Sequence, residues 1–386
     1  MNDRLHRGPS RPILALGFRP FFLLAGLFAV AAMLLWTLVL AGSGPALGPL
    51  WHGHEMLFGY AGAVIAGFAL TAAANWTGRP TLTGAPLAAI ALVWVAARIA
   101  VALPGAPDGL KAGLCAGFFA FLAAGIGRPI LATGNRRNYG IIGMMAVFTV
   151  LELVYWLAPS LRERVLESAL MFILLLVAVI GGRIIPAFTR NATPGLQVRP
   201  GGQWRDWTAL ASLAVFGVLV LCPATRLPVL GAVAAFGALA HALRMWGWGG
   251  RTTRRRPILW VLQAAYACLP LGLALLAAQD VGVPIPRWVS LHVLAVGALG
   301  LMTLGMMTRV SLGHTGRRIV ADKVTTLAYL LLAASVVVRA AGPFLGASNW
   351  RASMLAAAVL WTLAFVLFLV VYAPILFAPR PDGKPG

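Results

Sequence analysis

The chain has 386 residues, of which 60% are hydrophobic and only 11% are charged. Soluble domains carry about 25% charged residues to cover their surfaces, so this composition excludes a soluble protein and indicates an integral membrane protein. The net charge of +21 would suggest nucleic-acid binding in a soluble chain. Here 28 of the 31 basic residues are Arg and most lie between apolar runs, which is typical of a multi-spanning membrane protein.

Twelve apolar runs are long enough to cross a hydrocarbon core of about 30 Å, and they must be helices because the bilayer core offers no other partner to backbone polar groups. We therefore expect an all-α polytopic membrane protein, with residues 1–386 forming a single transmembrane domain. The predicted spans are 18–41, 54–75, 85–104, 110–131, 140–158, 164–188, 207–223, 226–246, 257–278, 287–309, 324–345 and 351–378.

The distribution of basic residues predicts the orientation of the spans. If the N-terminus is cytoplasmic, 23 Lys and Arg residues fall in inside segments and 6 in outside segments. The positive-inside rule therefore places both termini in the cytoplasm. The basic N-terminal segment runs into a full-length span without a clear cleavage site, which indicates a retained first helix rather than a signal peptide.

A weak internal repeat has a period of four spans. The second span ends in LTAAANWTGRP, the sixth in IPAFTRNATPG and the tenth in MMTRVSLGHTGR. Polar, Gly-rich segments are common wherever helices end, so the similarity has a simple explanation. The alternative is three four-helix units around a pseudo-threefold axis, with the second, sixth and tenth spans in equivalent inner positions.

Titratable residues are scarce, so each one within the membrane requires an explanation. His52 and His54 lie at the outer start of the second span, and His292 lies near the outer start of the tenth. Trp51 precedes His54, and Trp288 precedes His292, by about one turn, and both Trp residues mark the same headgroup interface. Neutral imidazoles at matched depth on two helices suit a metal or a haem iron. His6, His241 and His314 are predicted to lie on the cytoplasmic side.

The spacing of His52 and His54 restricts how they can act. Residues two apart on a helix point about 200° away from each other, so both cannot face one iron. Either His52 lies in the loop before the helix, or one histidine binds haem while the other binds a second metal. The expected haem pair is His54 with His292, and His52 with His292 is the competing pair. Glu55 follows directly and is the candidate catalytic residue, to orient a histidine, carry a proton or meet a cation.

Other candidates have simpler explanations. Met302, Met306 and Met307 are soft copper ligands by type, but Met in so apolar a chain is usually core filler. Arg98 and Arg339 suit haem propionates, although extending to the nearest headgroups is the ordinary behaviour of Arg near a helix end. Cys115, Cys222 and Cys268 have no paired spacing, which indicates neither a disulfide framework nor a Cys-ligated zinc site.

Four segments resemble the NnrS family of haem- and copper-containing membrane proteins associated with the response to nitric oxide. They are LALGFRPFFLLAG (14–26), WHGHEMLFGYAGAVIAGFALTAAANWTGRP (51–80), GGRIIPAFTRNA (181–192) and LHVLAVGALGLMTLGMMTRVSLGHTGR (291–317). The resemblance implies a bacterial inner-membrane protein with haem, allows copper, and implies protection from nitrosative stress. The choice of His52, His54 and His292 rests on the topology argument and not on the family.

A more distant similarity concerns architecture alone. Catalytic subunits of haem–copper oxidases and nitric oxide reductases also have twelve helices in three arcs, with haem histidines on the second and tenth. The sixth and seventh spans of this chain contain no histidine where the second metal's ligands would be expected. If the relationship holds, the usual binuclear centre is missing, and chemistry must use the outer site.

The sequence leaves three functions open. The first is a protein that binds haem b, since no CxxCH motif attaches a haem covalently, and that binds and reduces or detoxifies nitric oxide. The second is a carrier exporting a metal or nitrosyl-metal species, and the third is a sensor or assembly partner without turnover. A carrier needs a polar site at the midplane, whereas the polar residues here gather at one face. The expected partners are nitric oxide, membrane lipids and an electron donor that the sequence does not identify. No nucleic acid is expected, and the sequence leaves open whether the protein forms an oligomer.

Overall fold

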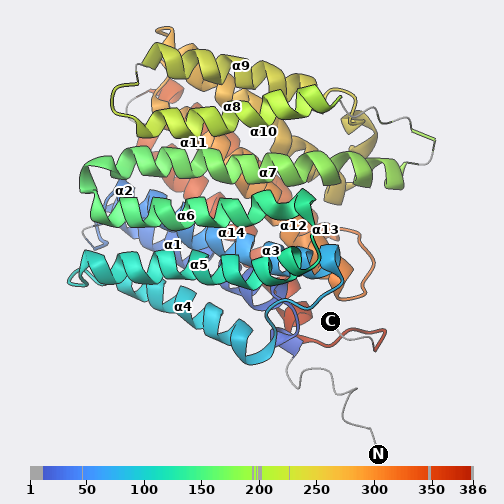
Figure 1. Ribbon diagram of the computed structural model, residues 1–386. Helices are drawn as coiled ribbons and strands as arrows, with labels where there is room; N and C mark the ends of the chain where they lie inside the picture. Colours follow the sequence, from blue (N-terminus) through green and yellow to red (C-terminus); the bar gives the residue numbers. More distant parts are fainter. Residues whose placement is uncertain are drawn as a thin grey trace, which may run out of the picture.

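The structure is a bundle of long helices (Figure 1). This computed structural model describes residues 12–383 except 46, 194, 197, 199–201, 226, 347 and 348. All regular elements of the described residues are helices, and twelve spans are long and apolar enough to cross a membrane. The predicted fold class is therefore confirmed, and each predicted span corresponds to an observed one.

The spans follow each other in chain order. They are α1 (Phe18–Ala41); α2, η2 and α3 (Pro49–His54, Glu55–Ala61, Gly62–Thr77); α4 (Gly84–Ala102); α5 (Asp108–Ala132); η3 and α6 (Arg136–Asn138, Tyr139–Leu157); η4 and α7 (Pro159–Leu161, Arg162–Ala192); α8 (Gln203–Leu221); α9 (Leu227–Met245); α10 (Pro257–Asp280); α11, η6 and α12 (Arg287–His292, Val293–Gly300, Leu301–His314); α13 and η7 (Lys323–Ala341, Gly342–Leu345); and α14 (Trp350–Phe377). Two further 3-10 turns, η1 (Pro12–Leu14) and η5 (Gly250–Thr253), precede α1 and α10.

The second, sixth and tenth spans are the inner ones. Their most apolar windows are 89%, 67% and 78% buried, against at most 61% for any other span. Groups of four consecutive spans meet through α5 and α6, α9 and α10, and α14 and α1. This is the arrangement that three four-helix units around one axis require. The threefold relation itself stays a prediction.

The second and tenth spans share an unusual construction. Each begins with six α-helical residues that end in a histidine, His54 or His292, and each continues with a π-helical segment, η2 or η6, before returning to α-helix. π-Helical turns are rare and are often found at functional sites. The two histidines therefore occupy matching places in two inner helices.

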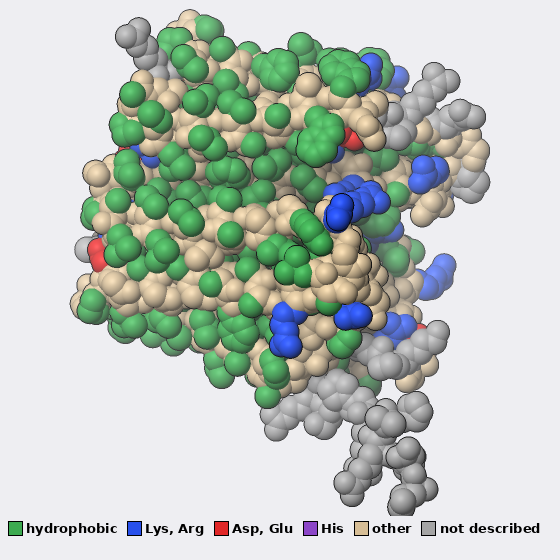
Figure 2. Space-filling model, viewed as in Figure 1, with side chains coloured by type: hydrophobic (Ala, Val, Ile, Leu, Met, Phe, Trp, Pro, Cys, Tyr) green, Lys and Arg blue, Asp and Glu red, His purple; other side chains and the backbone are tan. Residues whose placement is uncertain are grey.

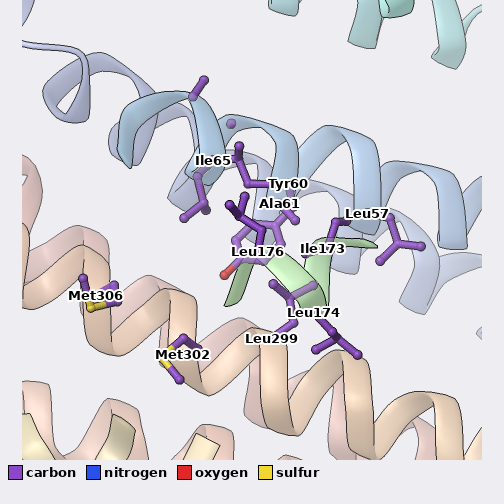
Figure 3. Close-up of a cluster of buried hydrophobic side chains, with 14 of the residues drawn as sticks. Leu57, Tyr60, Ala61, Ile65, Ile173, Leu174, Leu176, Leu299, Met302 and Met306 are labelled. Atoms are coloured by element: carbon purple, nitrogen blue, oxygen red, sulfur yellow. The ribbon is translucent and has the colours of Figure 1, made fainter. Parts of the chain in front are cut away.

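Aliphatic side chains fill the space where the three inner spans meet. Leu57 and Ile65 from the second span, Ile173 from the sixth, and Leu299 and Met302 from the tenth lie close to one another (Figure 3). Tyr60 bridges the second and tenth spans, with its hydroxyl 2.6 Å from Thr303 Oγ1. Among the described residues of this cluster, the side chains are thus apolar apart from this hydrogen-bonded pair.

The two ends of the bundle differ in charge. Figure 2 shows hydrophobic side chains over the visible helix faces and most of the visible Lys and Arg at one end. Arg19, at the start of α1, donates hydrogen bonds to the carbonyls of Leu376 and Ala378 at the end of α14, so the first and last spans meet at the same end. Several residues used in the sequence predictions lie outside the described residues, namely Arg4, His6, Arg7, Arg11, Arg199, Arg226 and Lys384.

Candidate functional site

His52 and His54 point to different neighbours. The His52 ring stacks on Trp36 of α1, with centroids 4.8 Å apart and planes at 15°. The His54 ring instead packs 4.5 Å from Tyr155 of α6. The alternative with His52 in a loop was wrong, because α2 begins at Pro49 and contains both histidines. Their two-residue spacing on one helix then sends them in nearly opposite directions.

His54 lies in a fully buried chain of charged groups. Its Nδ1 is 2.7 Å from Glu55 Oε1, and its Nε2 is 2.9 Å from Glu152 Oε2 of α6. Arg98 of α4 donates to the same Glu55 oxygen at 2.5 Å. Carboxylates buried in a membrane protein require such partners, since an unpaired charge there is costly. The expectation that Arg98 extends to the headgroups was therefore wrong, because its side chain is buried against Glu55.

Aromatic rings close this cluster off. His54 and Glu152 are 0% exposed. The ring centroids of Phe58 and Trp156 lie 5.2 and 5.1 Å from that of His54, in addition to the Tyr155 ring. Bulk water is thereby kept away from both ring nitrogens, and each of them is already bonded to a carboxylate.

Three of the residues form a possible metal-binding set. One donor atom each from His54, Cys115 of α5 and Glu152 lie within 4.8 Å of one another. The second carboxylate oxygen of Glu152 is buried with no hydrogen-bond partner among the described residues. Glu55 holds the far nitrogen of His54, as carboxylates hold metal-binding histidines in many proteins. The arrangement can hold a metal through nitrogen, sulfur and oxygen donors.

Sequence reasoning missed Cys115 and Glu152. A signal for Glu152 was present, because it is a carboxylate inside the apolar run 140–158 and such residues usually have a function. Cys115 gave no such signal, since a single thiol in an apolar helix behaves as a small hydrophobic residue. Only the packing of α5 against α6 reveals its neighbours.

His292 has one ring nitrogen fixed and one open. Its Nδ1 donates to the backbone carbonyl of Trp288 at 2.6 Å, which leaves a lone pair on Nε2. His52 lies near enough to interact electrostatically with His292, and its Nδ1 is buried without a partner among the described residues. His52 is therefore the better placed of the two to act with His292, because His54 faces α6.

Arg339 of α13 completes this second group. Its guanidinium lies 3.9 Å from the Trp288 ring centroid and interacts electrostatically with both His52 and His292. Its Nη1 is buried with no hydrogen-bond partner in the described part of the chain. An unpaired guanidinium beside two imidazoles favours an anionic partner.

The remaining candidates lie elsewhere. His241 Nδ1 is 2.9 Å from the Tyr266 hydroxyl, in a separate buried group with Arg244. His314 is the last residue of α12 and lies 3.5 Å from Asn75 Nδ2. The three methionines considered as copper ligands, Met302, Met306 and Met307, are buried in the apolar core.

Comparison with known proteins identifies the family. The model of a family described as NnrS protein matches residues 12–380, which is nearly the whole chain. No curated protein matches the chain significantly. The match covers all twelve spans, including both groups of buried polar residues around His54 and around His292. The chain therefore belongs to the NnrS family, as its sequence motifs predicted.

Proposed function

We propose that this member of the NnrS family is a haem-binding protein of the bacterial inner membrane that binds nitric oxide and reduces or otherwise detoxifies it. The observation that carries the proposal is the grouping of His52, His292 and Arg339 at one end of the two π-containing spans. We call this group the outer site.

The outer site has the donors that haem b requires. Two neutral imidazoles suit an iron, and His292 Nε2 and His52 Nδ1 are the nitrogens left open. The Arg339 guanidinium suits a propionate. His54 lies instead against Glu152 and Cys115, a compact set of donors that suits a single metal ion better than a haem iron. The geometry therefore favours the pairing of His52 with His292 over that of His54 with His292.

Each residue of the outer site has a positioning neighbour. The Trp288 carbonyl fixes the tautomer and orientation of His292, and the Trp36 ring holds His52 by stacking. Trp288 also holds Arg339 against its face. A bound haem would supply an iron that captures nitric oxide and exchanges electrons with a donor.

The buried cluster around His54 is the second part of the proposal. Imidazole and thiolate are donors that copper favours, so His54, Cys115 and Glu152 are the residues that we propose for copper. Glu55 is proposed as the catalytic residue, a carboxylate that accepts a proton beside His54 Nδ1 and passes it on, because reduction of nitric oxide consumes protons. Arg98 keeps the Glu55 carboxylate in place.

Orientation in the membrane follows from the charge distribution. The basic end of the bundle is proposed to be cytoplasmic, with both termini there and the outer site near the periplasmic face. Lipids then contact the exposed aliphatic side chains of the spans, such as Leu34, Leu92 and Val218. No observation favours the carrier alternative, because the described side chains at the centre of the inner spans are mostly aliphatic (Figure 3).

An optical spectrum of the purified protein tests the haem proposal. The protein, expressed with adequate haem supply, should show a Soret band and a reduced-minus-oxidised difference spectrum that shifts when nitric oxide is added. Acid acetone should extract the haem, since no covalent attachment motif exists. A colourless preparation that is folded and consumes nitric oxide would contradict the proposal.

Single histidine variants test the ligands. His52→Ala and His292→Ala should each remove or strongly alter the haem spectrum, whereas His54→Ala should keep it and lower the copper content. His241→Ala is the matched control, because His241 is buried and hydrogen-bonded in a different part of the bundle. If His54→Ala loses the haem while His52→Ala keeps it, the iron is bound by His54 and His292 instead.

A further inference from the structure

A cavity with both polar and apolar lining residues lies at the opposite end of the bundle from the outer site. Its volume is about 360 Å³, and side chains from the later parts of α3, α7 and α12 and from η3 line it. This volume is within the range of about 300–1,000 Å³ typical of small-molecule sites. Asn75 and Arg137 are exposed at its edge, so the cavity opens to solvent.

The three chain segments that formed the weak sequence repeat converge here. Asn75 and Trp76 belong to the segment that ends the second span, Phe188 to the one that ends the sixth, and Met306 and His314 to the one that ends the tenth. These segments thus do more than terminate helices, because each contributes residues to the wall of one cavity. Neither the haem proposal nor the copper proposal uses them.

The cavity wall is positively charged. Arg137 and Arg183 line it, and none of its described lining residues is an Asp or a Glu. Arg183 donates to Asn138 Oδ1 at 3.0 Å and to the Arg137 carbonyl at 3.4 Å, which holds its guanidinium at the cavity rather than extended toward lipid headgroups. Two guanidiniums without a carboxylate between them favour an anion.

The polarity of the wall changes with depth. Phe68, Ile180 and Met306 also line an adjoining apolar cavity, so they form the inner part of the wall. Trp76 and Phe188 add aromatic surface, and Arg309 lies 3.7 Å over the Phe188 ring from outside the lining set. A ligand with a charged end and an apolar part matches this gradient.

We propose that this cavity binds a small organic anion that carries a phosphate or carboxylate group and enters from the end of the bundle assigned to the cytoplasm. Arg183 and Arg137 contact the anionic group, with Asn75 and Asn138 as neutral hydrogen-bonding partners. The apolar inner wall contacts the rest of the ligand. The same anionic chemistry is available from a soluble metabolite and from the headgroup of an acidic phospholipid.

Thermal unfolding of the full-length purified protein in neutral detergent tests the proposal. Inorganic pyrophosphate is the probe, and sodium chloride at equal ionic strength is the reference. A ligand that binds only the folded state raises the midpoint of unfolding in a saturable manner. We expect such a rise for the wild type, and at least about tenfold weaker binding for Arg183→Gln, because one charge-assisted contact is lost.

Matched variants separate this site from general charge effects. Arg128→Gln removes an exposed positive charge of α5 that does not line the cavity and should respond to pyrophosphate like the wild type. Arg137→Gln should weaken binding as Arg183→Gln does, which keeps the test usable if one variant fails to fold. Two results together would overturn the proposal. Pyrophosphate would stabilise the wild type no more than sodium chloride does, and phosphatidylglycerol would stabilise the wild type no more than the cavity variants.

Nanodiscs distinguish the two sources of the anion. If the occupant is a lipid headgroup, replacing phosphatidylcholine by phosphatidylglycerol should stabilise the wild type but not Arg183→Gln. If it is a soluble metabolite, the lipid exchange should affect both proteins equally while pyrophosphate discriminates between them. Both readouts are independent of haem. Loss of the haem spectrum in Arg183→Gln and Arg137→Gln would instead assign the cavity to the haem site and contradict a separate anion site.

Discussion

At the scale of single residues, the charged cluster around His54 is the most constrained part of the molecule. Four titratable or charged side chains from α2, η2, α4 and α6 are almost fully excluded from solvent, namely His54, Glu55, Arg98 and Glu152. Each hydrogen-bonds at least one other member of the cluster. Removal of one member leaves its neighbour charged and unpaired, which costs more than the pair itself contributes.

Arg98→Leu should therefore destabilise the protein by about 3–5 kcal/mol, because the Glu55 carboxylate loses its cation in a buried site. The double variant Arg98→Leu/Glu55→Gln should be more stable than Arg98→Leu, since the uncompensated charge is then absent. Chemical or thermal unfolding of the purified protein measures both effects.

An exposed ion pair is the control for this prediction. Asp108 pairs with Arg162 at 2.9 Å while 48% of its side chain is exposed, so Asp108→Asn should cost no more than about 1 kcal/mol. If Arg98→Leu destabilises the protein as little as Asp108→Asn does, the buried Glu55 carboxylate does not require Arg98 as its partner.

The sequence predicted part of this chemistry for a physical reason. His52, Glu55 and His292 are polar residues at the starts of apolar runs, and any such residue can be found without knowing its neighbours. The pairing of these side chains with residues of other helices cannot be predicted in this way, because hydropathy does not reveal which faces of two helices meet. The links from Arg98 to Glu55 and from Glu152 to His54 therefore became visible only in the folded structure.

At the scale of the elements, span ends were predicted well and their exceptions have local causes. The second span was predicted from residue 54 but begins at Pro49, a residue type favoured in the first turn of a helix. The tenth span was predicted to end at 309 but continues to His314. The polar residues there remain helical, and the hydroxyls of Thr308 and Thr315 donate to the carbonyls of Gly305 and Ser311 about one turn earlier.

The π-helical segments were not predicted. Their sequences, EMLFGYA and VLAVGALG, have the hydropathy of any membrane helix, and hydropathy does not distinguish α-turns from wider ones. Packing supplies the missing information at Gly59 in η2. A side chain at this position would meet Phe28 of α1 and Arg98 of α4, so a glycine allows these helices to approach η2 closely.

Gly59→Ala should consequently destabilise the protein by about 1–3 kcal/mol, as is usual for overpacking. The added Cβ would lie 2.6 Å from Phe28 Cε1 and 3.0 Å from Arg98 Nη1, the atom that donates to Glu55. Gly113→Ala in α5 is the control, because its Cβ meets no atom within 4 Å. Comparison of unfolding midpoints measures the difference. If the two variants are equally stable, η2 moves away from α1 and α4 to make room for the added methyl group without a loss of stability.

At the scale of the whole molecule, two polar sites lie at opposite ends of an apolar bundle. The outer site and the His54 cluster occupy one end, and the anion cavity occupies the other. Aliphatic side chains of the three inner spans separate them (Figure 3). Ligands of the two proposed sites would therefore enter from different sides of the membrane, and the orientation of the bundle would decide which ligands each end can meet.

The accessibility of Cys222 tests this orientation. Cys222 is exposed just after α8, at the end of the bundle proposed to be periplasmic, whereas Cys115 is buried and Cys268 is half-buried within α10. A membrane-impermeant maleimide should label intact cells with a permeabilised outer membrane, and Cys222→Ser should abolish this labelling. Cys115→Ser should leave it unchanged. Labelling confined to inside-out vesicles would reverse the orientation and place the outer site in the cytoplasm.

The pH dependence of the same reaction identifies the labelled thiol. Hydrogen bonds from the backbone amide of Ala224 and from the side chain of Thr225 lower the pKa of the Cys222 thiol. Because the thiolate is the form that reacts with maleimide, a lower pKa leaves more of it at a given pH. The rate should thus reach its plateau at a lower pH than that of a free cysteine, and Thr225→Val should move the profile toward the free thiol. A profile identical to that of free cysteine would mean that these hydrogen bonds do not hold the thiolate in the membrane-bound protein.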